Sequence, residues 1–125
     1  SGMPGVETSL PVMLTHASEG KCTISDVVRW MSTNPAECYN IQNKGRLEIG
    51  YDADLVLVDM NNSHPVKDSN CWTKVGWNPF AGKELVGWPQ VTIVSGKPVF
   101  ERTRGDFDKG KILANPDAVG SPLIM

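Results

Sequence analysis

The side chains that could bind a transition metal or act as a nucleophile are few in this 125-residue chain, and they are scattered along it. They are two histidines, His16 and His64, and three cysteines, Cys22, Cys38 and Cys71, which share no C-x-x-C spacing. A zinc site needs about three or four ligands that converge on one point, and a nucleophilic cysteine needs a neighbouring base. The sequence therefore predicts neither a metal site nor a catalytic nucleophile within the chain. The odd number of cysteines favours free thiols in a reducing cytoplasm.

Two short patterns match the beginning of known binding loops but lack the residues that complete them. Asp52-x-Asp54 has no oxygen-rich continuation of the kind that an EF-hand uses to bind calcium, so a turn followed by a strand is favoured. Gly2-x-Pro4-Gly5 is not followed by Lys-Ser or Lys-Thr, which excludes a phosphate-binding loop.

One segment alternates aromatic and basic side chains, as proteins that bind single-stranded nucleic acid do. Its members are Trp72, Lys74, Trp77, Phe80, Lys83 and Trp88. Against this reading, the net charge of -2 provides no general basic face for nucleic acid or for a membrane surface. No apolar run approaches the roughly 20 residues of a membrane-spanning helix. The alternative is that these aromatic side chains are buried anchors.

The N-terminal part of the chain has the pattern of helices. Thr8 or Ser9 is predicted to cap a first helix, which ends at Gly20 in a left-handed C-cap. A second helix begins at Thr23, and its apolar residues follow the helical period of a buried face: Ile24, Val27, Val28 and Met31. Asn34 is predicted to cap a third helix, with Pro35 in its first turn and Glu37 placed for a capping box.

The pattern changes to short strands after Gly45. A short strand is predicted at 46–49 and a buried strand at 54–59, and a loop is predicted at 61–65. A hairpin is predicted at 91–101, with its turn at Ser95-Gly96. From Arg104 onward the chain is expected to be a tail that lies on another surface or is disordered. A sheet of only a few short strands needs another layer to cover its apolar faces. The helices could cover it in a compact α+β domain, or they could belong to another layer of a larger protein.

Four blocks of the sequence resemble, in the same order, the cyclic amidohydrolases of the dihydroorotase type. Ser1–Pro11 is similar to the stretch that follows the last metal ligand in dihydroorotases and in their dihydropyrimidinase and allantoinase relatives. The next two blocks are Ser32–Ala36 and Lys44–Val56, the second of which resembles the entry into the family's small β-sandwich. The fourth is Asn78–Gly82 followed by Gly87-Trp88-Pro89 and Val91–Val94.

The resemblance implies an architecture for this α+β chain. Residues 1–43 would be the last helices of a (β/α)8 barrel, and residues 44–125 would be the C-terminal half of the β-sandwich and a tail. The N-terminal strands that complete the sandwich are expected to lie on a missing N-terminal segment of the same enzyme. This packing favours buried anchors over nucleic-acid binding for the aromatic segment.

The resemblance also implies a zinc-dependent chemistry whose ligands and catalytic aspartate all lie upstream of Ser1. No catalytic residue and no metal ligand can be assigned within the chain. What carries over is a substrate contact at Pro4 and Gly5, where the family's loop closes over the barrel mouth and offers backbone groups to a cyclic imide. The alternative is that this Pro-Gly pair only shapes a strand-to-helix turn.

The expected function follows from the family. The parent would be a cytoplasmic dihydroorotase that interconverts N-carbamoyl-L-aspartate and dihydroorotate in pyrimidine biosynthesis, a reading that Gly87-Trp88-Pro89 favours. A dihydropyrimidinase (hydantoinase) or an allantoinase is the first alternative, and a free-standing, non-catalytic binding or scaffold module is the second. We expect the isolated chain to be inactive and to self-associate, no nucleic-acid or membrane partner, and a homo-oligomeric parent.

Overall fold

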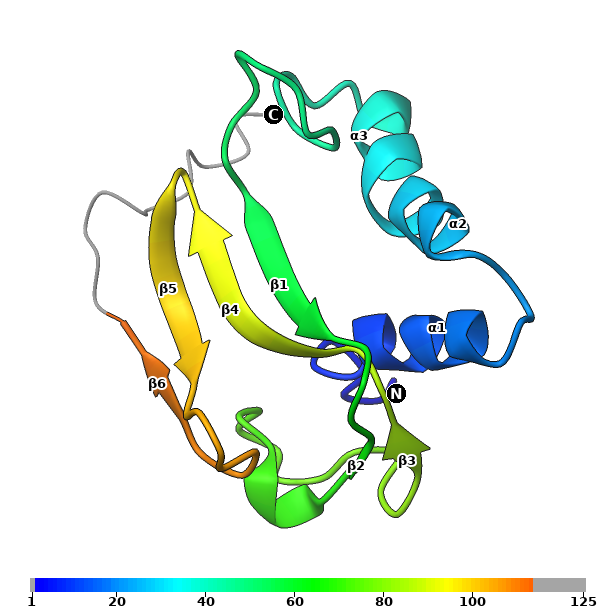
Figure 1. Ribbon diagram of the computed structural model, residues 1–125, viewed down its shortest axis with the longest axis vertical. Helices are drawn as coiled ribbons and strands as arrows, with labels where there is room; N and C mark the ends of the chain where they lie inside the picture. The colour runs from blue at the N-terminus through cyan, green and yellow to red at the C-terminus, as the bar shows by residue number, and fades with distance from the viewer. Residues whose placement is uncertain (1, 114–125) are drawn as a thin grey trace.

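The computed structural model describes residues 2–113, in which helices come first and strands follow (Figure 1). The helical elements are α1 (Ser9–Ser18), α2 (Ile24–Val28), the π-helical turn η1 (Arg29–Thr33) and α3 (Asn34–Cys38). The strands are β1 (Leu55–Asp59), β2 (His64–Pro65), β3 (Glu84–Leu85), β4 (Trp88–Val94), β5 (Lys97–Arg102) and β6 (Gly110–Ile112), with a short 3-10 turn η2 at Asp68–Asn70. The prediction of an α+β chain is confirmed. None of the helices within residues 2–113 has the length and apolar composition to cross a membrane.

Helix α1 has the bounds that the sequence predicts, but Thr8, at its N-cap position, makes no capping side-chain hydrogen bond, so the predicted N-terminal cap is wrong. It starts at Ser9, directly after Thr8, and Gly20 follows its end with φ of +78°. The N–H of Gly20 donates to the carbonyl of Ala17 (3.1 Å), and the N–H of Lys21 donates to that of His16 (3.0 Å). These bonds satisfy carbonyl groups that the last helical turn leaves free, which is the role of a left-handed glycine cap.

Helices α2 and α3 form one continuous helix through η1, so the prediction of a separate third helix capped by Asn34 is wrong. The start of α2 is as predicted: the Thr23 hydroxyl accepts the N–H of Asp26, and the Asp26 carboxylate accepts the N–H of Thr23 (both 3.0 Å). Asn34, however, has helical angles, φ −64° and ψ −44°. The wider π turn before it accommodates Pro35, whose ring would clash with a carbonyl four residues earlier in a regular α-helix. Glu37 forms an ion pair with Arg46 instead of a capping box.

The apolar stripe of the second helix is not a buried face. Val27 is 1% exposed and packs in the core, but Ile24, Val28 and Met31 are among the exposed large apolar side chains. In Figure 1 this helix lies beyond the end of α1 and away from the sheet, so only one side of the stripe has a neighbour. The apolar period therefore predicts a buried position correctly only for Val27, because the period carries no information about what covers the face.

The strands form a four-stranded antiparallel sheet in the order β1-β4-β5-β6 and a two-stranded sheet of β2 and β3. The predicted hairpin is confirmed as β4–β5, with positive φ at both turn residues, Ser95 (51°) and Gly96 (78°), as a type I′ turn requires. Strand β1 is present but not buried, because Val56 and Leu57 of this edge strand are exposed.

Three other predictions for this part of the chain are wrong. Residues 46–49 contain a bend at Arg46 and the start of a turn at Ile49 but no strand. The predicted loop at 61–65 contains β2, which pairs with β3. The predicted tail contributes β6, which pairs with β5, while residues 114–125 lie outside the described residues. Pairing between strands far apart in sequence is decided by neighbours that a local pattern does not contain.

A cluster of buried apolar residues joins the two sheets. It consists of Val66, Leu85 and Trp88, with Val12, Phe80 and Phe107 packed around it. Leu14 and Pro11 of α1 are also buried, so the first helix packs against the connection between β3 and β4. This packing fixes the start of α1, and with it the segment that precedes Ser9, relative to the strands.

An ionic contact joins the segment after the helices to the hairpin turn. Lys44 Nζ lies 3.1 Å from a carboxylate oxygen of Asp52 and also forms a short hydrogen bond with the carboxylate of Asp54. The second oxygen of Asp54 accepts the N–H of Ser95 (2.9 Å). The Lys44 hydrogen bond holds the pKa of Asp54 below its usual value.

Acid is expected to weaken this contact. Because the pKa of Asp54 is lower in the folded chain, its contribution to stability is complete above the unfolded pKa of about 3.9 and is lost as the pH falls through the folded value. Urea unfolding between about pH 2 and 6 should therefore show a smaller acid-induced loss in Asp54→Asn than in the wild type. The difference should stay below about 1 kcal/mol, since the side chains of Lys44 and Asp54, 23% and 33% exposed, still contact water. Equal losses in both proteins would contradict the assignment.

Candidate functional site

The structure places Pro4 and Gly5 in an extended segment that turns into α1. Both residues are partly buried, and residues 6–8 form a turn between them and the helix. The carbonyl of Gly5 accepts the N–H groups of Thr8 (3.3 Å) and Ser9 (3.0 Å). The Pro4–Gly5 pair is therefore held by the first backbone hydrogen bonds of the helix start, which gives it a defined position in the fold.

Nothing within residues 2–113 requires a glycine at position 5. Its φ lies outside the left-handed region, and a Cβ added to it would meet no atom within 4 Å. The alternative that Gly5 is needed for the geometry of the turn therefore has no steric support. The open space beside Gly5 leaves room for a molecule from outside the chain to approach its backbone.

Two side chains attach this turn to the segment at 68–80. The Glu7 carboxylate accepts the backbone N–H groups of Trp72 (2.8 Å) and Thr73 (3.0 Å), one on each oxygen. Asn78 reaches the turn from the other side: its Nδ2 lies 3.4 Å from the carbonyl oxygen of Pro4 and 3.2 Å from Oγ1 of Thr8. Both ends of residues 4–8 are therefore fixed by groups about 70 positions later in the sequence.

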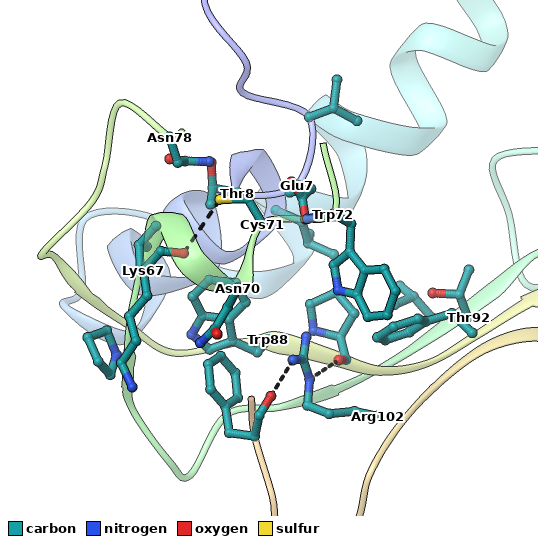
Figure 2. A pocket seen from close by; sticks show the side chains of 18 residues that line it. Glu7, Thr8, Lys67, Asn70, Cys71, Trp72, Asn78, Trp88, Thr92 and Arg102 are labelled. Carbon is teal, nitrogen blue, oxygen red and sulfur yellow. Dashed lines mark hydrogen bonds between the residues drawn. The ribbon is translucent and has the colours of Figure 1, made fainter. Parts of the chain in front are cut away.

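A cavity of about 460 Å³ lies beside this turn, between the sheet and the segment at 68–80 (Figure 2). Its walls are mainly apolar and include Trp72, Trp88 and Phe100. Its charged lining residues are Glu7, Lys67 and Arg102. Pro4 and Gly5 do not line it, so the structure does not bring the predicted substrate contacts and this cavity together.

The guanidinium of Arg102 lies over three of the aromatic rings that line the cavity. Its guanidinium carbon lies 4.4 Å from the ring centre of Phe107, 5.5 Å from that of Phe100 and 5.8 Å from that of Trp88. Nε donates to the carbonyl of Pro89 (3.0 Å) and Nη1 to that of Phe107 (2.7 Å), as Figure 2 shows. Burial lowers the pKa of Arg102, but an arginine remains charged, and carbonyl oxygens and ring faces stabilise that charge.

The residues with metal-binding chemistry do not converge. His16 lies on the surface of α1 near Glu19 and Lys21, and His64 stacks on Phe107 with 3.8 Å between ring centres. The three cysteines are free thiols. Among residues 2–113 no three His, Cys, Asp or Glu side chains lie close enough together to hold a metal ion. The described residues therefore do not fit a zinc centre.

The aromatic segment divides into two groups. Trp88 is 8% exposed and Phe80 partly buried, as the anchor interpretation predicts. Trp72 and Trp77, however, are exposed. The prediction of buried anchors is therefore confirmed for Trp88 but wrong for these two tryptophans within the described chain.

Comparison with known proteins identifies the family. The model of the amidohydrolase family matches residues 5–99, and the chain belongs to that family. The dihydroorotase of Pyrococcus horikoshii is 42% identical over 101 residues, which cover 81% of this chain and 24% of the relative. The dihydroorotase of Anoxybacillus flavithermus is 41% identical over 107 residues, 84% of this chain and 24% of the relative.

Solved structures of related enzymes have the same fold over this region. An L-hydantoinase (dihydropyrimidinase) from Arthrobacter aurescens aligns with a TM-score of 0.81 and 34% identity, covering 91% of this chain and 24% of that one. A D-hydantoinase (dihydropyrimidinase) from Thermus sp. aligns with a TM-score of 0.71 and 30% identity, covering 79% and 22%. The chain thus spans about a quarter of the length of the relatives it matches.

Proposed function

We propose that this chain is the C-terminal portion of a dihydroorotase-like, zinc-dependent cyclic amidohydrolase that interconverts N-carbamoyl-L-aspartate and dihydroorotate in pyrimidine biosynthesis. The observation that carries the proposal is the identity of 42% to a dihydroorotase over 81% of the chain. The hydantoinase alternative is supported by the structural match at a TM-score of 0.81, but at the lower identity of 34%.

Within that enzyme the chain would contribute to substrate binding. The peptide between Pro4 and Gly5 would offer its backbone groups to the imide of the ring, while open space beside Gly5 leaves room for the ring itself. Zinc would be bound by residues outside this chain, because the described residues do not fit a metal centre. Residues 1–43 would complete the barrel, and residues 44–125 would form half of the β-sandwich.

The missing partner would be the N-terminal segment of the same enzyme. Its strands would cover the exposed apolar residues Val56 and Leu57 of β1, which is an edge strand of the sheet within residues 2–113. A homo-oligomeric enzyme in the cytoplasm, where the three cysteines would stay reduced, completes the proposal.

A ring-opening assay tests the proposal directly. We expect no turnover of dihydroorotate by the isolated 125-residue chain above a metal-free blank. A polypeptide that carries this chain together with an upstream segment containing an H-x-H motif should turn over dihydroorotate in preference to hydantoin, dihydrouracil and allantoin. Turnover of dihydroorotate by the isolated chain would contradict the expectation that this chain is inactive on its own.

The other outcomes separate the alternatives. A preference of the longer polypeptide for hydantoin or dihydrouracil would assign it to the hydantoinases, and a preference for allantoin to the allantoinases. A longer polypeptide that binds zinc but turns over none of these substrates would favour a non-catalytic module.

A further inference from the structure

We propose that Asn78 is a positioning residue for the Pro4–Gly5 turn and thereby sets the affinity of the enzyme for its cyclic substrate. The inference rests on the proposed function, since it takes this turn to be a substrate contact. It assigns a role in substrate binding to a residue 74 positions away from Pro4 in the sequence.

The contacts of Asn78 use both ends of its side-chain amide. Oδ1 accepts the backbone N–H of Phe80 (2.9 Å) and lies 3.4 Å from Oγ1 of Thr8. Nδ2 donates to Oγ1 of Thr8 (3.2 Å) and to the carbonyl oxygen of Pro4 (3.4 Å). The side chain is 4% exposed and that of Thr8 is 2% exposed, so water does not replace these partners easily.

The orientation of the amide follows from its partners. The N–H of Phe80 is a donor and can only be met by the oxygen, which places Nδ2 on the side of Thr8 and Pro4. Asn78 is itself fixed, because its backbone N–H donates to the Asp68 carboxylate (2.8 Å). A donor in a determined position is therefore directed at the carbonyl of Pro4, the peptide group that precedes Gly5.

This contact controls the turn more directly than the other long-range attachments do. The Glu7 carboxylate holds the backbone at Trp72 and Thr73, but it leaves the side of the turn with Pro4 free. Figure 2 shows Asn78 beside Thr8, with Glu7 and Trp72 on the other side of the same turn. When Asn78 loses its donor, the Pro4 carbonyl loses the one side-chain hydrogen bond that it accepts from residues 2–113.

Two nearly isosteric substitutions test the proposal in the active enzyme. Asn78→Asp replaces the donor by an oxygen that repels the Pro4 carbonyl, and Thr8→Val removes the hydroxyl that joins the two residues. We expect each to raise the KM for dihydroorotate about tenfold or more, with kcat changed less than about threefold, because a displaced turn weakens binding in the ground state and the transition state alike. Thr8→Ser keeps the hydroxyl and should restore the KM.

Thr15→Val is the matched control. The Thr15 hydroxyl accepts the N–H of Val86 (3.0 Å), so it also attaches α1 to a distant segment, but it does not contact the turn. Its loss should lower stability and leave the KM unchanged. If Asn78→Asp and Thr8→Val also lower stability without raising the KM, Asn78 has a merely structural role and the proposal is overturned.

Hydrogen exchange on the 125-residue chain separates this inference from the proposed function. In Asn78→Asp the amides of Thr8 and Ser9, which donate to the Gly5 carbonyl, should exchange at least about tenfold faster, while that of Val12 keeps its rate. If the wild-type enzyme shows no ring-opening activity, the proposed function fails, and faster exchange still supports the positioning of the turn. Unchanged exchange overturns it.

Discussion

Replacing Gly87 with alanine is expected to lower the free energy of unfolding by about 2–5 kcal/mol. Gly87 has a φ of +76°, which costs an ordinary residue about 1–2 kcal/mol. An added Cβ would also lie 2.5 Å from Cβ and 2.6 Å from Cδ1 of Leu14, closer than van der Waals contact allows. Because Leu14 is buried in α1, either the helix or the strand connection must move, and such overpacking costs about 1–3 kcal/mol more.

Gly76→Ala is the control for this prediction. Gly76 has a similar φ of +71°, but a Cβ there would meet no atom within 4 Å. Urea unfolding should therefore show a loss of only about 1–2 kcal/mol for Gly76→Ala, and the excess in Gly87→Ala measures the contact between α1 and the β3–β4 connection. Equal losses in the two variants would mean that this contact is looser than the structure shows.

The features that the sequence predicts correctly are those whose causes lie within a few residues. The Thr23–Asp26 capping box, the glycine cap after α1 and the Ser95-Gly96 turn each depend on groups that are near one another in the chain. Their geometry follows from the residue types alone, whatever packs around them.

The features that could not be predicted depend on distant neighbours. The period of α2 marks an apolar face, yet Ile24 and Val28 are exposed because no described residue covers them. Strand β6 exists because β5 offers it an edge, although its own sequence has no strand pattern. Propensity is a weak prior in such places, and tertiary contacts decide the outcome.

The candidate site shows the same division. Pro4 and Gly5 are predicted as substrate contacts because they belong to a recognisable block, and that role stays a prediction. The groups that hold them, Glu7 and Asn78, were missed as site residues, since nothing local indicates that Asn78 meets Thr8 across 70 positions. The signal that could have found it is the presence of both residues in blocks that resemble the same family.

Replacing Trp88 with alanine is expected to lower the free energy of unfolding by about 3–5 kcal/mol. Its ring is 8% exposed, belongs to the core cluster with Val66 and Leu85, and lies 5.0 Å from that of Phe107. Its Nε1 donates to the carbonyl of Leu85 (2.9 Å). Truncation would leave a cavity between the two sheets and an unmet carbonyl, which is the reason for so large a loss.

Trp72→Ala is the control for the stability loss expected in Trp88→Ala. Trp72 is 51% exposed and contacts Phe100 edge to face at 5.8 Å, so its removal should cost only about 0.5–1.5 kcal/mol. Urea unfolding of both variants, with titration of single-stranded DNA at low and high salt, then tests the aromatic segment as a whole. A large loss for Trp88→Ala without DNA binding supports a structural role. Salt-sensitive binding near micromolar that Trp72→Ala abolishes would instead make the exposed tryptophans a nucleic-acid surface.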